Sequence, residues 1–162
     1  MKQLLMTILC LSIVIGCNKS TPCEKEIYLI PECLRGKIIV FFNQADGQAI
    51  QYEDNARVYH ILSSGLLKTQ FKRNGGCMGD NRIQFFYEDS LGGRKPIDYF
   101  LNIDRENIPS DKDHVLMTFL SDGNSEPDFV IHLLGCSNEF KELTNSVKDI
   151  DPGKILKSIN NY

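Results

Sequence analysis

The sequence predicts a mainly β domain, with a sandwich or barrel-like fold, followed by one or two C-terminal α-helices. Three observations support this prediction. Short apolar or alternating segments recur at roughly 8–12-residue spacing between residues 26 and 135. Clusters rich in Gly, Asn, Asp and Ser, which favour turns, separate these segments. After residue 136 the apolar spacing changes from two to the three or four residues of a helix.

The first predicted strand is EIYLIP (26–31), and a turn at ECLRG separates it from KIIVFFNQ (37–44). Apolar residues fill most of this second segment, as expected of a strand covered on both faces. The remaining strands are expected in ARVYHIL (56–62), LLKTQFK (66–72), RIQFFYED (82–89), PIDYFLNI (96–103), HVLMTFL (114–120) and FVIHLLG (129–135).

Two helices are predicted after the last strand. Ser137 or Asn138 is expected to cap the first, and Asp151 followed by Pro152 resembles the N-terminus of the second. One apolar stripe on the first helix, which we expect to pack on the sheet rather than on a partner, is formed by Phe140, Leu143, Val147 and Ile150. The second helix is expected to point Ile155, Leu156 and Ile159 inward.

The chain opens with MKQLLMTILCLSIVIGC, in which Lys2 precedes an apolar run that ends at Gly16. This run is shorter than the roughly 20 residues of a membrane-spanning helix and is typical of a secretory signal. Its end, Val-Ile-Gly-Cys17, resembles the lipobox of bacterial lipoproteins. The resemblance implies a signal peptide over 1–16 and a lipidated Cys17. The polar residues that follow predict a short tether, over 17–26, and the length of the mature chain predicts a single β-rich globular domain over 27–162.

The residue after the lipobox cysteine bears on where the protein is located, and the net charge bears on which partners it binds. Asn18, rather than Asp, follows the lipobox cysteine. Resemblance to Gram-negative lipoproteins then implies an outer-membrane destination in the cell envelope, with the leaflet left open. Removing residues 1–16 takes away Lys2 and no acid, so the net charge of −3 becomes about −4. This charge argues against a nucleic-acid partner, and the expected partners are the membrane and an envelope protein.

Four cysteines remain after the signal and the lipid anchor: Cys23, Cys33, Cys77 and Cys136. An even number in an exported chain favours disulfides. A strand between Cys23 and Cys33 would hold them too far apart to be bridged to each other. We therefore expect each of the two to pair with Cys77 or Cys136. Free thiols are the alternative, whereas zinc ligation lacks a CxxC or His-x-x-x-His spacing.

The sequence identifies no catalytic residue, metal ligand or cofactor motif. The loop from Asp122 to Asp128 lacks the Gly and Glu of a calcium loop, because Pro127 and Leu133 occupy those positions. NGGCMGDN lacks the Gly-Lys-Ser/Thr of a phosphate loop. We expect structural roles for the three histidines, His60, His114 and His132. A Cys–His or Asp–His pair is the enzymatic alternative.

Two stretches, IYLIPECLRGKIIVFFNQADGQ and YEDNARVYHILSSGLLKTQF, resemble an uncharacterised family of small bacterial envelope lipoproteins. The match spans 27–71 and is carried by Tyr28 to Glu32, Gly36, Tyr52, Glu53, Arg57 to Tyr59, Gly65 and Thr69 to Phe71. Three departures are Cys33 in place of a usual Gly, Asn55 in place of a turn Gly, and Ile61-Leu62 in place of Ile-Pro. The opening is also similar to prealbumin-like sandwich modules. The resemblance implies a β-rich envelope lipoprotein and no established activity.

The leading functional hypothesis is a lipid-anchored, non-enzymatic binding or interaction module, including one that binds a host or competitor molecule. The alternative is a small hydrolase or redox enzyme whose site is assembled only in three dimensions. A pocket of polar residues converging on one histidine would favour the enzyme. A flat apolar patch would favour the interaction module.

Overall fold

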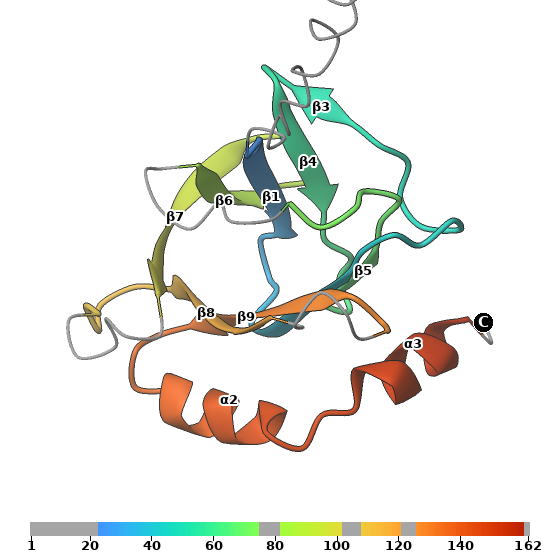
Figure 1. Ribbon diagram of the computed structural model, residues 1–162. Helices are drawn as coiled ribbons and strands as arrows, with labels where there is room; N and C mark the ends of the chain where they lie inside the picture. The colour runs from blue at the N-terminus through green and yellow to red at the C-terminus, as the bar shows by residue number, and fades with distance from the viewer. Residues whose placement is uncertain (1–22, 75–81, 102–107, 121–125, 161–162) are drawn as a thin grey trace, which may run out of the picture.

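The computed structural model describes residues 23–74, 82–101, 108–120 and 126–160, which form a curled sheet and two helices (Figure 1). The strands are β1 (Lys25–Pro31), β2 (Gly36–Phe41), β3 (Tyr52–Glu53), β4 (Ala56–His60), β5 (Leu66–Lys68), β6 (Ile83–Glu88), β7 (Arg94–Leu101), β8 (His114–Leu120) and β9 (Phe129–Gly135). The helices are α2 (Phe140–Val147) and α3 (Pro152–Ile159). Every predicted strand segment contains an observed strand, although LLKTQFK contributes only the three residues of β5.

The strands form one sheet in the order β3-β4-β1-β6-β7-β8-β9-β2-β5, which curls into a half-barrel. Strand β1 is parallel to both of its neighbours, β4 and β6. The pairs β7–β8 and β2–β5 are also parallel, and the other pairs are antiparallel. The predicted mainly β, barrel-like class with C-terminal helices is therefore confirmed.

Gln48 links β5, at one end of the curled sheet, to β4, the strand next to the other end. Its backbone joins β5, because Gln48 N–H donates to the Lys68 carbonyl at 2.7 Å and Gln70 N–H donates to the Gln48 carbonyl at 3.0 Å. Its side-chain amide joins β4, donating to the Val58 carbonyl and accepting from His60 N–H, both at 3.0 Å. Gln48 thus bridges β4 and β5 with hydrogen bonds, as a residue of an intervening strand would.

The core is divided between the inside of the half-barrel and its helix-covered face. Strand β2 is buried on both sides, as predicted. Ile38 and Val40 pack inside the half-barrel, whereas Ile39 and Phe41 pack beneath the helices. The interior is rich in aromatic rings, with Tyr28 stacked 4.7 Å from Phe85 between ring centroids.

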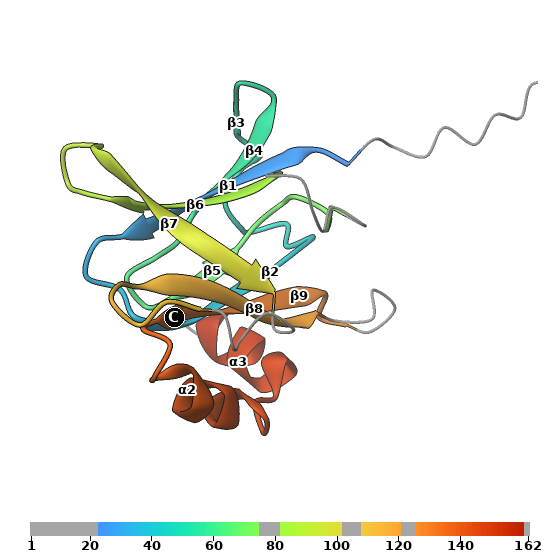
Figure 2. The ribbon, with the colours of Figure 1, turned by 90° about the vertical axis from the view of Figure 1, so that its left-hand side faces the viewer.

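Helices α2 and α3 cover the outer face of β8, β9, β2 and β5 (Figure 2). The four residues of the predicted stripe and the three predicted inward residues of α3 all pack against this face, so both predictions are confirmed. Asp151 caps α3 by accepting from Lys154 N–H at 3.1 Å. The predicted cap of α2 is wrong, because the N-cap is Glu139 and its side chain makes no capping bond. The first backbone N–H groups of α2 are satisfied by backbone carbonyls of the preceding turn instead. For example, Phe140 N–H donates to the Ser137 carbonyl.

Strand β1 begins at Lys25, inside the range that was assigned to the tether. Glu26 is buried, accepting from the Tyr28 hydroxyl at 3.0 Å and the Tyr59 hydroxyl at 3.4 Å. Burial raises the pKa of Glu26, and these hydrogen bonds oppose the rise. Strand β1 therefore starts eight residues after Cys17. None of the helices in the described part of the chain is long and apolar enough to cross a bilayer.

The β3–β4 turn accommodates the departure at Asn55. Asp54 and Asn55 have φ angles of 48° and 64°, so both occupy the left-handed region. A two-residue hairpin turn of this kind favours Gly, which has no Cβ, and Asn and Asp, whose short polar side chains can hydrogen-bond locally at positive φ. Asn55 can therefore replace the usual Gly without changing the turn.

Candidate functional site

A groove of about 460 Å³ lies where β4, β1 and β6 end. Leu29, Pro31 and Ile61 supply apolar walls, and its polar lining comes from Glu32, Cys33, His60, Glu88, Asp89 and Ser90. Because the three strands are parallel, their carboxyl ends meet at the same edge of the sheet. Residues that are distant in sequence therefore converge there.

The strand register explains which side chains meet. Leu29 of β1 is paired with His60 of β4, and Pro31 of β1 is paired with Glu88 of β6. Neighbouring residues at the same level of a sheet project to the same face, and residues two apart in one strand also share a face. His60, Pro31 and Glu88 therefore lie on the outer face, away from the Tyr28 interior.

His60 and Glu88 are neighbouring polar side chains of the groove. His60 Nδ1 lies 3.7 Å from Glu88 Oε2, with 49% and 25% of the two side chains exposed. Arg94 approaches the other carboxylate oxygen of Glu88 at 3.4 Å and binds Glu53 at 2.7 Å. The hydrogen bond from Arg94 lowers the pKa of Glu53. This ion-pair chain holds Glu88 beside the imidazole.

The groove also has an exposed thiol and a fixed turn. Cys33 is exposed and free, and it lies in a turn closed by Leu34 N–H donating to the Pro31 carbonyl at 2.9 Å. Asp89 is held by its own turn, accepting from Leu91 N–H and Gly93 N–H, both at 2.8 Å. Glu32 is exposed, so it presents a carboxylate that a ligand can reach.

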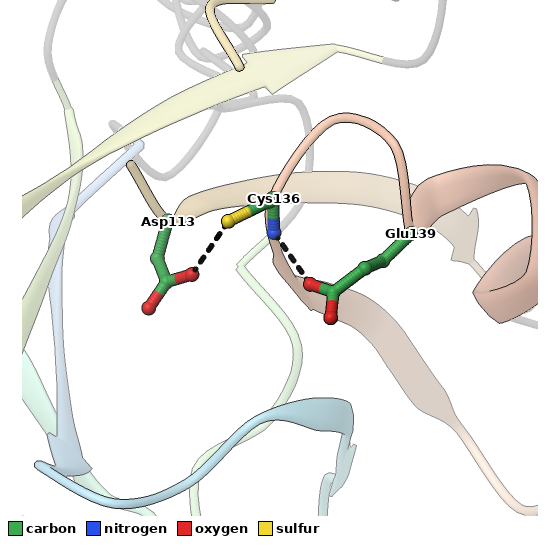
Figure 3. A group of neighbouring side chains, drawn as sticks. All are labelled: Asp113, Cys136 and Glu139. Carbon is green, nitrogen blue, oxygen red and sulfur yellow. Dashed lines mark hydrogen bonds between the residues drawn. The ribbon is translucent and has the colours of Figure 1, made fainter. Parts of the chain in front are cut away.

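A second polar cluster joins the β1–β2 turn to the starts of β8 and α2 (Figure 3). One oxygen or sulfur atom from each of Asp113, Cys136 and Glu139 lies within 4.8 Å of the other two. Arg35 forms an ion pair with Asp113, and its Nη2 lies 3.1 Å from Cys136 Sγ and 3.6 Å from Glu139 Oε2. Glu139 also accepts from Cys136 N–H at 2.8 Å. The guanidinium thus occupies the position that a metal ion would need.

Electrostatics indicate a structural role for this cluster. Burial alone would raise the pKa of Asp113, but hydrogen bonds from Arg35 and Tyr87 hold it below its ordinary value. Burial and the bond to Asp113 raise the pKa of Tyr87. Asp113 is therefore a stable anion, which fixes Arg35 and the β1–β2 turn against β8.

Comparison with known proteins gives a family and a fold. A model described as "Family of unknown function (DUF6843)" matches residues 23–128. The chain belongs to this family. The fold is also similar to the crystal structure of a "Putative Lipoprotein from Bacillus anthracis", with a TM-score of 0.52 and 22% identity over 72% of this chain and 75% of that one. No curated protein matches the chain.

The extent of the DUF6843 match distinguishes the two candidate sites. Every residue that lines the groove lies inside it, from Leu29 to Ser90. The second cluster needs Cys136 and Glu139, which lie beyond residue 128. A second, mainly apolar groove of about 330 Å³, which His60 also lines, needs Ile159, which lies outside the match too. The groove at the strand ends is therefore the better candidate for a site shared by DUF6843 proteins.

The structure corrects the expected disulfides. Cys33 and Cys136 are free thiols, so neither is in the disulfide that was expected of it. The cause is topological, since Cys33 faces the outer groove whereas Cys136 contacts Arg35. Cys23 is not left as a free thiol, and Cys17 and Cys77 lie outside the described residues.

Asn74 and Arg82, the described residues on either side of 75–81, are both held near Cys23. Asn74 Nδ2 donates to the Glu24 carbonyl at 2.7 Å, and Arg82 Nη1 donates to the Cys23 carbonyl at 2.8 Å. A Cys23–Cys77 pair would need this proximity. It is one of the pairings that the sequence left open.

The histidines divide into two kinds. His114 and His132 are 0% and 1% exposed, and no hydrogen-bond partner for their ring nitrogens is present among the described residues. They pack against aromatic rings, as expected of structural residues. His60 differs, because it is half-exposed and lines the groove. Sequence reasoning missed its partner Glu88, since only the pairing of β4 and β6 with β1 brings the two together.

Proposed function

We propose that this DUF6843 protein is a lipid-anchored protein of the cell envelope, held by Cys17. The lipobox-like sequence supports this proposal, and so does the likeness of the fold to a protein that is itself named a lipoprotein. The start of β1 lies on the side of the domain opposite the helices (Figures 1 and 2). An anchor eight residues before β1 would keep this side near the membrane and turn the helices away from it.

Replacing Cys17 with Ser is expected to leave an uncleaved or soluble precursor in place of the lipidated mature protein, because the acyl chains that supply about 0.8 kcal/mol per buried CH₂ can no longer be attached. Cell fractionation and intact mass would measure this, with Cys10→Ser as the matched control that keeps the anchor. A Cys17→Ser protein found in membranes at the mature mass would contradict the proposal. If the destination is the outer membrane, Asn18→Asp should move the protein to the inner membrane.

We also propose that the domain is a binding module whose ligand enters the groove at the ends of β4, β1 and β6. The single observation that carries this is the convergence of apolar walls and carboxylates in one groove. The half-buried Pro31 suits an apolar chain, whereas Leu29 and Ile61 are only 2% and 4% exposed. Glu32 and Glu88 suit a positively charged end. The expected ligand is therefore a small amphipathic amine.

Hexylamine tests this proposal, with hexanoate as the probe of opposite charge. Hexylamine is expected to shift the NMR signals of His60 and Ile61 with a dissociation constant of about 1 mM, equivalent to about −4 kcal/mol. Hexanoate should leave these signals unchanged. Glu32→Gln should weaken amine binding several-fold, whereas Glu142→Gln on the exposed side of α2 should not. Equal shifts by both probes, or shifts outside the groove, would overturn the proposal.

A specific observation also favours the second candidate, a small hydrolase. Polar residues converge on one histidine in the groove, with Glu88 beside it and a free thiol in the same lining. This is the arrangement that distinguishes an enzyme site from a flat interaction patch.

A further inference from the structure

The groove at the strand ends offers a ligand more charge than apolar surface. Its carboxylates can be reached, because Glu32 is exposed and 25% of the Glu88 side chain is exposed. Leu29 and Ile61 are only 2% and 4% exposed, so the protein itself already covers their apolar surface. An amphipathic amine whose ammonium group binds there must therefore place most of its alkyl chain outside this groove.

The second groove, of about 330 Å³, provides that apolar surface, and the half-exposed His60 lines both grooves. We call it the tail groove, and its apolar lining consists of Leu62, Leu66, Leu67 and Ile159. Leu62 is 59% exposed, and Leu66 and Ile159 are half-buried. A ligand can therefore contact apolar side chains here that the strand-end groove does not offer.

The polar side chains of the tail groove are bonded to other parts of the protein. Lys68 Nζ binds Asp46 at 2.5 Å and the side-chain oxygen of Asn160 at 2.8 Å. The oxygen and the nitrogen of the Gln48 side-chain amide both bond to the backbone of β4 at 3.0 Å. Because displacing these partners would cost hydrogen bonds, the tail groove favours an uncharged alkyl chain over a polar ligand.

We propose that one ligand occupies both grooves and that it is a long-chain alkylamine. Its ammonium group lies beside Glu32 and Glu88, its chain passes along the His60 imidazole, and its end packs on Leu62 and Ile159. This inference rests on the proposal that the groove at the strand ends holds an amine. It adds the ligand class, an amine whose alkyl chain is longer than that of hexylamine.

The C-terminal helix gives the tail groove its own role. Ile159 is the last residue of α3 and lies beyond residue 128, where the DUF6843 match ends. The strand-end groove lies wholly inside that match. We therefore expect the strand ends to select the charge of the ligand and α3 to select the length of its chain.

An NMR titration that compares hexylamine with decylamine, below the concentration at which decylamine forms micelles, tests this inference. Decylamine is expected to bind at least tenfold more tightly than hexylamine, because each methylene that is fully buried adds roughly fourfold to the affinity. It should shift the methyl signals of Leu62 and Ile159 as well as the ring signals of His60.

Leu62→Ser is expected to lower the ratio of decylamine affinity to hexylamine affinity at least threefold, because it removes exposed apolar surface from the tail groove. Leu91→Ser is the matched control. Leu91 is 94% exposed, lies between β6 and β7 and lines neither groove, so the ratio should stay unchanged. Ile159→Ala should also lower the ratio, and circular dichroism of each variant identifies loss of folding.

Hexylamine binding with a ratio near one, or decylamine shifts that do not reach Leu62 and Ile159, would overturn the long-chain inference and retain the amine site. Absence of binding by both amines would overturn the two proposals together. Decanoate that binds as tightly as decylamine would overturn the inference, because the tail would then be held without the carboxylates. Signals of Leu62 and Ile159 that change with protein concentration, without any amine, would assign the tail groove to a second copy of the chain instead.

Discussion

Acidification from pH 7 to pH 4.5 is expected to lower the free energy of unfolding through His132 by roughly 2–3 kcal/mol, and His132→Leu is expected to abolish this contribution. His132 is completely buried against Tyr28 and Phe85, with centroid distances of 5.2 and 5.1 Å. Burial lowers its pKa from 6.5 to about 3. No described residue accepts or donates a hydrogen bond at its ring nitrogens.

The direction of this pH effect on stability follows from how many protons His132 binds in the folded and in the unfolded chain. Above pH 6.5 the imidazole is neutral in both the folded and the unfolded chain, so it makes no pH-dependent contribution. Between pH 6.5 and about 3 the unfolded chain binds a proton that the folded chain excludes. Stability is therefore lost as the pH falls through this range.

Urea unfolding of the wild-type and His132→Leu proteins at several pH values measures the effect. The difference between the pH dependences of the two free energies of unfolding isolates the contribution of His132, because groups such as Glu26 titrate in both proteins. The imidazole NMR signals of His132 should stay those of the neutral ring down to pH 5. Parallel stability curves for the two proteins would contradict this explanation.

Replacing Gly65 with Ala is expected to destabilise the domain by more than about 3 kcal/mol, the range of severe backbone effects. Gly65 precedes β5 with a φ of 77°, and a Cβ there would overlap the backbone carbonyl oxygen of Lys37. Its own carbonyl accepts from Ile39 N–H at 2.8 Å. Moving the chain to relieve the overlap would break the start of the β2–β5 pair.

Gly92→Ala is the matched control for this substitution. Gly92 has a similar φ of 81°, but a Cβ would meet no heavy atom within 4 Å. The Gly92→Ala variant should therefore lose roughly 1–2 kcal/mol of stability, the cost of placing alanine in the left-handed backbone region. Chemical denaturation of both variants measures the difference, and equal losses would show that close approach to Lys37 is unimportant.

The sequence predicted much of the fold because local patterns determine which segments become strands and helices. Continuous apolar residues in β2 indicated a strand buried on both faces. One face packs inside the half-barrel, and the other packs beneath the helices. Asp151-Pro152 indicated the start of α3. The cap of α2 was not predictable, since Ser137, Asn138 and Glu139 are all capable of starting a helix and the turn after β9 decides among them.

The candidate groove was not predictable because it depends on non-local pairing. Cys33, His60 and Glu88 lie in three different segments and form no motif by spacing. The parallel pairing of β1 with both β4 and β6 brings them to one edge. The same reason explains the disulfide error, since counting cysteines does not show on which face of the sheet each one lies.

The sequence alone determined the mainly β class, the helical C-terminus and the N-terminal lipobox that motivates the proposed anchor. These features depend on periodicity, local turn chemistry and contiguous residues. Only the tertiary structure decided the strand order, the closure of the sheet by Gln48, the free state of Cys33 and the meeting of His60 with Glu88. Those features depend on which distant strands pair, because pairing is selected by burial of the whole sheet rather than by any one segment.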